Sequence, residues 1–148
     1  MRGISIADIT SNYREQVNSY CRMLELASQQ LELAEKKLPA DNILAERHHL
    51  MEEISTLNAQ NQECQNAFCQ SAGIETFNIS SIKSIRNAAE VEELSQVLKE
   101  LAEVLQQIAA VDKHIHALLN QQLAFRHRPR TTPQRAQQSY RESTKPQN

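Results

Sequence analysis

The 148-residue sequence contains little glycine, proline or aromatic residue, and it contains no tryptophan. There are 2 Gly and 4 Pro, and aromatic residues make up 4% of the chain. Tight turns need glycine and proline, and strands favour aromatic residues, so the composition argues against a β-rich or loop-rich fold. Two glycines also cannot form a glycine-rich phosphate-binding loop. The core must therefore consist mainly of Leu, Ile, Val and Ala.

Cysteines and long apolar runs are also scarce. Cys21, Cys64 and Cys69 are odd in number and lack the spacing of a C-x-x-C or zinc motif, which favours reduced thiols in a cytosol-like compartment. The N-terminus lacks the apolar run of a signal peptide. No stretch approaches the roughly 18 apolar residues of a membrane-spanning helix. These features predict a soluble, cytoplasmic protein with no membrane span.

The histidines lack the spacing of a metal or catalytic site. His48 and His49 are adjacent, so they point about 100° apart on a helix, and His114 and His116 do not share a helix face either. His48 and Glu52 have the i,i+4 spacing that two metal ligands could use, but scattered surface histidines explain the pattern better. We predict no enzyme activity, no bound metal and no cofactor.

One stretch, residues 87–125, organises the chain. It contains no Gly or Pro, and its apolar residues recur at alternating spacings of three and four, which is typical of one helix face. As a helix it would be about 58 Å long. Additional apolar residues beside this seam widen it, so that it can contact two neighbouring helices. The seam is formed by Leu94, Val97, Leu101, Val104, Ile108, Val111, Ile115, Leu118, Gln122 and Phe125.

Two shorter helices precede this stretch. The spacing predicts the first over residues 5–38, with Ser5 and Asp8 as a capping box and Pro39 ending the helix. The second is predicted over 41–71, with Asp41 as its N-cap. Because so few residues separate them, the two helices should form an antiparallel hairpin.

A connector follows at residues 72–86, where Gly73 is placed for a left-handed helix cap. We expect one helical turn from about Ser80, with the connector's apolar residues plugging one end of the molecule. Asn87 has the position of an N-cap for a third helix over 87–127. The fold class is thus all-α: an elongated antiparallel bundle of three long helices in one domain, residues 1–127.

Arg47 and Asn61 interrupt the apolar seam of the second helix. A polar group on a seam costs stability unless it is partnered, and it often fixes the register of packed helices. The preferred interpretation is that both residues lie at the edge of the apolar stripe.

Residues 128–148 form a segment of different composition. Residues 1–125 hold 10 basic and 17 acidic residues, a net charge of −7, whereas residues 126–148 hold 6 and 1, a net charge of +5. With no aliphatic residue larger than Ala136, this segment is predicted to be a disordered basic tail. Its composition matches no nucleic-acid-binding motif, so DNA binding is the least favoured function.

Two segments resemble the FlgN family of flagellar export chaperones. Residues 46–54 read ERHHLMEEI, similar to that family's Glu-Lys/Arg-x-x-Leu-Leu-x-x-Leu run. Residues 111–120 read VDKHIHALLN, similar to its Leu-Asn-x-x-Asn-Gly-x-Leu-Leu segment, although Ile115 and His116 stand where the family has Asn-Gly. The resemblance in helix order and length covers most of residues 5–127.

This resemblance implies a cytoplasmic chaperone of type III secretion. FlgN-like proteins bind the C-terminal helical segment of the hook-associated proteins FlgK and FlgL, prevent their premature self-association and deliver them to the export gate. The tail would dock on the gate component FlhA, with Tyr140 as the candidate contact. The client-binding residues implied by the resemblance are Val111, Ile115, Leu118, Leu119, Gln122 and Phe125.

A second function stays open on the same residues. The long seam could serve homo-oligomerisation, which would make the protein a structural coiled-coil adaptor or scaffold. The two alternatives differ in whether the late part of the third helix contacts a client or a second copy of the chain.

Overall fold

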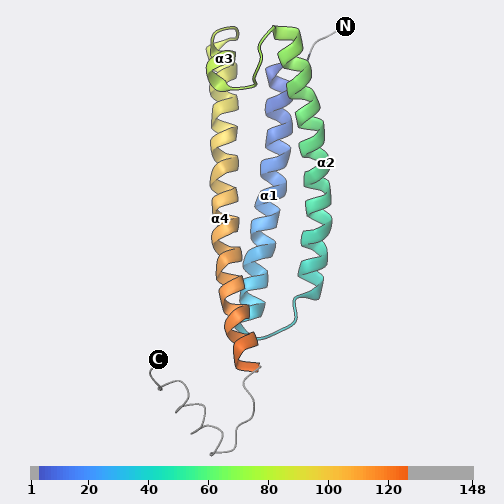
Figure 1. The fold of residues 1–148 in the computed structure, drawn as a ribbon, viewed down its shortest axis with the longest axis vertical. Coiled ribbons are helices and arrows are strands. Elements are labelled where there is room, and N and C mark those ends of the chain that lie inside the picture. The colour runs from blue at the N-terminus through green and yellow to red at the C-terminus, as the bar shows by residue number, and fades with distance from the viewer. Residues whose placement is uncertain (1–3, 127–148) are drawn as a thin grey trace, which may run out of the picture.

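The computed structural model describes residues 4–126, with side chains described as far as Ala124 (Figure 1). It contains the helices α1 (Ile6–Glu35), α2 (Asp41–Ala72), α3 (Ile79–Lys83) and α4 (Ala88–Arg126), and no strand occurs in this part of the chain. The all-α prediction is confirmed. There are four helices where three were predicted, because the turn expected near Ser80 is the separate five-residue helix α3. The predicted tail, with Tyr140, lies outside the described residues.

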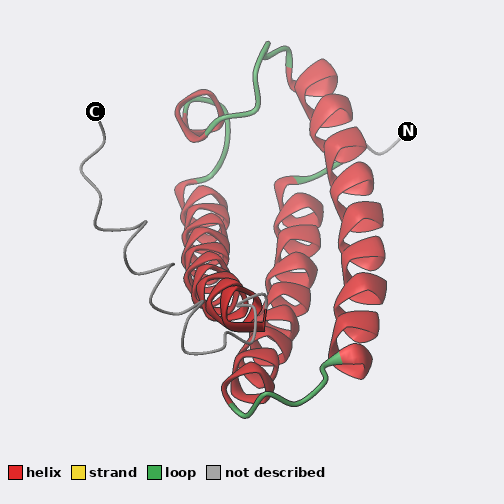
Figure 2. Ribbon diagram, turned by 60° about the horizontal axis from the view of Figure 1, so that its bottom comes forward, coloured by secondary structure: helices red, strands yellow, loops and turns green. Residues whose placement is uncertain are grey.

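The helix α1 is the centre of the fold. It runs antiparallel to α2 and parallel to α4, and it packs against both (Figures 1 and 2). By contrast, no described Cα atom of α2 lies within 8 Å of one in α4. The contacts between α2 and α4 are therefore made by side chains, as in the shared apolar cluster of Leu50, Ile54, Val104 and Ile108.

The first helix begins as predicted and ends three residues early. Asp8 N–H donates to Ser5 Oγ at 3.2 Å and Ser5 N–H donates to Asp8 Oδ2 at 3.1 Å, which completes the capping box. At the other end Lys37 adopts a left-handed conformation with φ 57°. Lys37 N–H then bonds Ala34 O, and Leu38 N–H bonds Leu33 O at 2.9 Å, so the helix closes in a Schellman motif before Pro39 can act.

The ends of α2 differ in how well they were predicted. Asp41 is not the N-cap: Ala40 occupies that position without a side-chain hydrogen bond, and Asp41 lies in the first turn, where its charge favours the helix dipole. Gly73 does form the predicted left-handed cap, with φ 74°.

Asn87 caps the start of α4, since its Oδ1 accepts from Ala89 N–H at 2.8 Å.

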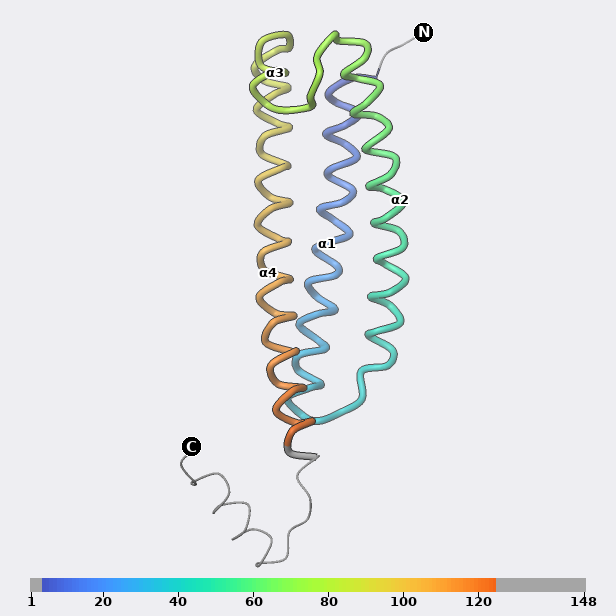
Figure 3. Tube along the Cα trace, viewed as in Figure 1, coloured from blue at the N-terminus to red at the C-terminus, as the bar shows by residue number. Residues whose placement is uncertain are grey.

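The core consists of two apolar clusters along the bundle. One lies at the end of the bundle that the connector and α3 cover (Figure 3). Ile82 of α3 is completely buried there, and the ring of Phe77 packs edge-on against that of Phe68 with centroids 5.9 Å apart. This confirms the prediction that the connector plugs one end. The members of this cluster are Ile6, Ile9, Phe68, Ile82, Val91 and Leu94. The members of the second are Met23, Leu26, Leu50, Ile54, Val104 and Ile108.

A polar layer of Tyr13, Gln16, Asn61 and Gln65 lies between residues of the two clusters along α1 and α2. Gln65 Nε2 donates to the Tyr13 hydroxyl, and burial raises the pKa of Tyr13 above its ordinary value. Gln16 and Asn61 are each 2% exposed. The interpretation of Asn61 as an edge residue is therefore wrong: it faces the interior, where its Oδ1 has no protein partner.

Candidate docking groove

A groove lies where the ends of α1 and α4 meet the start of α2. We name it the end groove. Its volume is about 580 Å³, and its walls are mainly apolar. Small residues, Ala34 and Ala40, leave room between leucine side chains from three segments of the chain. The lining residues are Gln30, Ala34, Lys37, Leu38, Pro39, Ala40, Leu44, His116, Leu119, Asn120, Gln122 and Leu123.

Exposed leucines concentrate in the end groove. Leu38, Leu44, Leu119 and Leu123 are each between 44% and 53% exposed. The other exposed large apolar side chains of the described residues are Met51, Ile85 and Leu105. Ile85 belongs to the loop between α3 and α4, and this loop lies at the opposite end of the bundle (Figure 1). Such a concentration of exposed apolar surface in a concave site is typical of a binding surface for another protein.

Polar contacts made by Gln122 and Arg47 hold the walls of the end groove in place. Gln122 Nε2 of α4 donates to Ala34 O of α1 at 2.8 Å, which fixes the end of α4 against α1. At the inner end, Arg47 of α2 makes a bidentate ion pair with Asp112 of α4, both N–O distances being 2.8 Å. Arg47 also donates to Gln30 Oε1 at 2.8 Å, so one cation joins three helices.

This network corrects the interpretation of Arg47. Its side chain is only 18% exposed and points between the helices rather than along the edge of the stripe. Because Gln30 both lines the end groove and accepts from Arg47, the polar network borders the groove on its inner side.

The six client-binding residues implied by the resemblance differ in where they lie and in how exposed they are. Leu119 and Gln122 line the end groove. Val111 and Leu118 are half-buried, and Ile115 is buried, so that it belongs to the bundle core rather than to an accessible surface. The side chain of Phe125 lies outside the described side chains.

The residues predicted from the sequence to bind a client do not include three leucines of the end groove. Leu38 and Leu44 flank Pro39, and Leu123 lies four residues after Leu119 on α4. Leu123 could have been found, because its spacing from Leu119 places both on one helix face. No local pattern indicates that residues 38–44 meet the end of a helix some 80 positions later.

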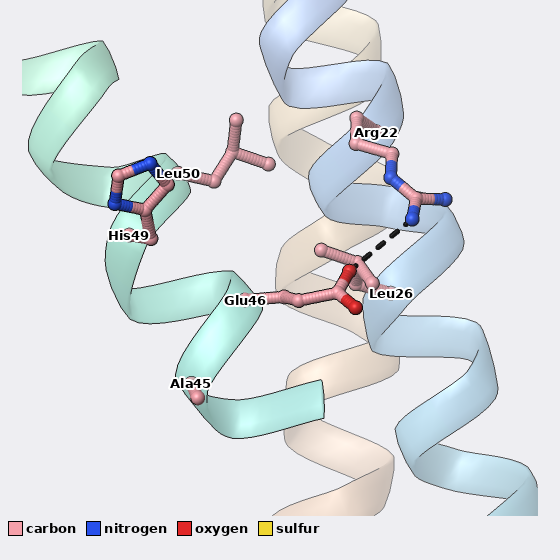
Figure 4. Close-up of a pocket in the computed structure, with 6 residues that line it drawn as sticks. All are labelled: Arg22, Leu26, Ala45, Glu46, His49 and Leu50. Carbon is pink, nitrogen blue, oxygen red and sulfur yellow. Dashed lines mark hydrogen bonds and ion pairs between the residues drawn. The ribbon is translucent and has the colours of Figure 1, made fainter. Parts of the chain in front are cut away.

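A second depression, of about 410 Å³, lies between α1 and α2 (Figure 4). Arg22 of α1 reaches Glu46 of α2 across it, with an N–O distance of 3.2 Å. Leu26 and Leu50 form its apolar floor, and both belong to the core cluster. The exposed side chains of Arg22 and Glu46 extend over this depression, and none of the predicted site residues lines it.

The described residues also show how the candidate metal and thiol groups are placed. His48 lies 3.2 Å from Glu52 and His49 lies 3.4 Å from Glu53, and all four side chains are exposed on α2. No three His, Cys, Asp or Glu side chains of residues 4–124 are grouped to hold a metal ion. The three cysteines are free thiols.

No family model, curated protein or solved structure matches the chain. Within residues 4–126, none of the helices combines the length and the apolar character that crossing a membrane requires.

Proposed function

We propose that this protein is a non-catalytic export chaperone of the FlgN type, acting in the cytoplasm. It binds the C-terminal helical segment of a hook-associated protein, FlgK or FlgL, and keeps that segment from self-associating before secretion. The end groove is the observation that supports this proposal, because four exposed leucines there offer the apolar surface that an amphipathic helix needs.

Binding of this kind must be reversible. A chaperone holds its client and then releases it at the secretion machinery, so a micromolar dissociation constant, about −8 kcal/mol, is sufficient. Burying leucine side chains that are half exposed in the free protein contributes to this energy, since each fully buried side chain is worth about 1.5–3 kcal/mol.

Calorimetric titration with the C-terminal segment of FlgK or FlgL from the same organism tests the proposal. Leu119→Asp places a charge in the end groove, and we expect it to abolish detectable binding while the helical circular dichroism stays unchanged. Ile85→Asp is the matched control, because Ile85 is also exposed but belongs to the loop between α3 and α4, at the opposite end of the bundle. Full binding by Leu119→Asp would contradict the proposal.

A structural adaptor is the second candidate function. The same exposed leucines could join two copies of the chain, since symmetric association through an apolar patch is common. Under this function Leu119→Asp converts an oligomer into a monomer, which light scattering measures directly.

The resemblance also places an export-gate contact in the tail, at Tyr140. We expect Tyr140→Ala to weaken binding to FlhA and to leave client affinity unchanged. Equal FlhA binding by the variant and the parent protein would remove Tyr140 from the proposal.

A further inference from the structure

The part of α4 that forms one wall of the end groove is held to the bundle by few side chains. We name this part, residues 116–124, the α4 wall. Ile115, just before it, is buried, but within the α4 wall only Leu118 and Gln122 are half-buried and the other seven side chains are exposed. The position of the α4 wall therefore depends on these two residues.

Gln122 connects the α4 wall to α1 by a hydrogen bond. Its Nε2 donates to the backbone oxygen of Ala34 at 2.8 Å. Ala34 lies in the last turn of α1 and is only 7% exposed. The Gln122 amide therefore points toward the end of α1, although other atoms of its side chain line the end groove.

The end of α1 favours a donor at this position. Carbonyl groups in the last turn of a helix lack intrahelical partners and carry the negative end of the helix dipole. No basic residue lies in the last turn of α1. Ala34 O also accepts from Lys37 N–H at 3.1 Å, so Gln122 supplies a second donor to the same oxygen.

The bond of Gln122 to α1 sets the place of two groove leucines. Leu119 lies one turn before Gln122 on α4, and Leu123 follows it directly. A helix keeps the relative positions of residues this close, so holding Gln122 against α1 also holds both leucines opposite Leu38 and Leu44. Without this bond the α4 wall is free to move away from α1, and the four leucines no longer line one concave site.

We infer that Gln122 is a positioning residue of the end groove, whose amide holds the α4 wall against α1 and does not donate to the client. The inference rests on the proposed function for the client that fills the groove. It differs from the direct contact with the client that the resemblance implies for Gln122.

Hydrogen–deuterium exchange of the full-length chain, followed by mass spectrometry, tests the positioning role without a client. Gln122→Met keeps the length of the side chain and removes its N–H donor. We expect amide exchange over the α4 wall to become about fivefold faster, because a lost hydrogen bond weakens the closed position. Unchanged exchange in Gln122→Met would overturn the inference.

Gln121→Met is the matched control for this measurement. It makes the same chemical change at the neighbouring residue, which is exposed and does not line the end groove. We expect its exchange to equal that of the parent chain. Equal acceleration by both variants would show a general effect of methionine on the end of α4 and would also overturn the inference.

Calorimetric titration with the C-terminal segment of FlgK or FlgL separates positioning from direct contact. Gln122→Met adds apolar surface, so a residue that touches the client's apolar face would bind equally well or better after this change. A positioning residue loses affinity instead, and we expect a loss of about threefold or more.

Gln122→Lys is the rescue variant. It restores an N–H donor on an unbranched side chain, and a cation is favourable at the C-terminal end of α1, so we expect its affinity to be within about twofold of the parent chain. A loss as large as that of Gln122→Met would contradict the role of the donated hydrogen bond.

The inference and the proposed function fail in different ways. If the segments bind the parent chain and Gln122→Met equally well, the chaperone function stands and the inference is wrong. If neither segment binds the parent chain, the chaperone function fails, and the exchange experiment alone decides whether Gln122 positions the α4 wall.

Discussion

Lys37 is the one non-glycine residue of the described chain with a positive φ. A left-handed conformation costs an L-residue roughly 1–2 kcal/mol, and glycine avoids this cost. Part of the gain is offset because glycine has more conformational freedom than lysine in the unfolded chain. Lys37→Gly should therefore raise the free energy of unfolding by about 0.5–1 kcal/mol. Urea denaturation followed by circular dichroism measures this difference. A loss of stability would mean that the Lys37 side chain contributes more than its backbone strain costs.

Tyr13 is a titratable residue of the polar layer whose pKa is shifted mainly by burial. Burial raises its pKa above the ordinary 10.0, and the hydrogen bonds from Gln65 and Asn61 offset this in part. The folded protein therefore holds the tyrosine proton more tightly than the unfolded chain does. This contribution to stability is complete below about pH 10 and is lost as the pH rises through the folded-state pKa.

An alkaline titration of phenolate absorbance tests the shift. One of the chain's three tyrosines should ionise at a higher pH than the others, and Tyr13→Phe should remove that late step. Simultaneous ionisation of all three tyrosines would show that the polar layer is open to solvent.

At the scale of the helices, the Arg47–Asp112 pair is the direct polar connection that the structure shows between α2 and α4. Removing Asp112 leaves a largely buried guanidinium with two side-chain acceptors, Gln30 Oε1 and the weakly accepting Met23 Sδ. Because Asp112 is itself 42% exposed, we expect Asp112→Ala to lower the free energy of unfolding by about 1–3 kcal/mol, below the full cost of a buried pair.

Glu93→Ala is the matched control for this prediction. It removes the Arg14–Glu93 pair, which is also an arginine–carboxylate pair at 2.8 Å but has a single hydrogen bond and side chains more than 50% exposed. Exposed pairs contribute about 0–1 kcal/mol, so Glu93→Ala should have the smaller effect. Equal losses in thermal or urea denaturation would contradict a structural role for Arg47.

The sequence predicts these helices well where their ends carry a local signal. Ser5, Asp8 and Gly73 have side chains or backbone freedom that act within four residues, and the structure places each as predicted. The end of α1 was missed because a left-handed lysine has no compositional signature. Asn61 and Arg47 were misplaced because whether a polar residue on a seam is buried depends on the facing helix, which periodicity does not describe.

At the scale of the whole molecule, the separation of α2 from α4 is the feature that the sequence could not supply. The apolar seams predict that the three long helices pack together. They do not predict which two of these helices have the fewest contacts with each other. Leu38 and Leu44 therefore became part of the candidate site only once the structure placed them opposite Leu119 and Leu123. Conversely, Ile115 is not an accessible client-binding residue, because it is 4% exposed and belongs to the core of the bundle.

The central claim is that the end groove receives a client helix rather than a second copy of the chain. The molar mass from light scattering, for the chain alone and mixed with the C-terminal segment of FlgK or FlgL, tests this claim most directly. We predict a monomer that forms a one-to-one complex, which Leu119→Asp disrupts and Ile85→Asp preserves. A stable oligomer that does not bind either segment would contradict the account and identify the protein as an adaptor.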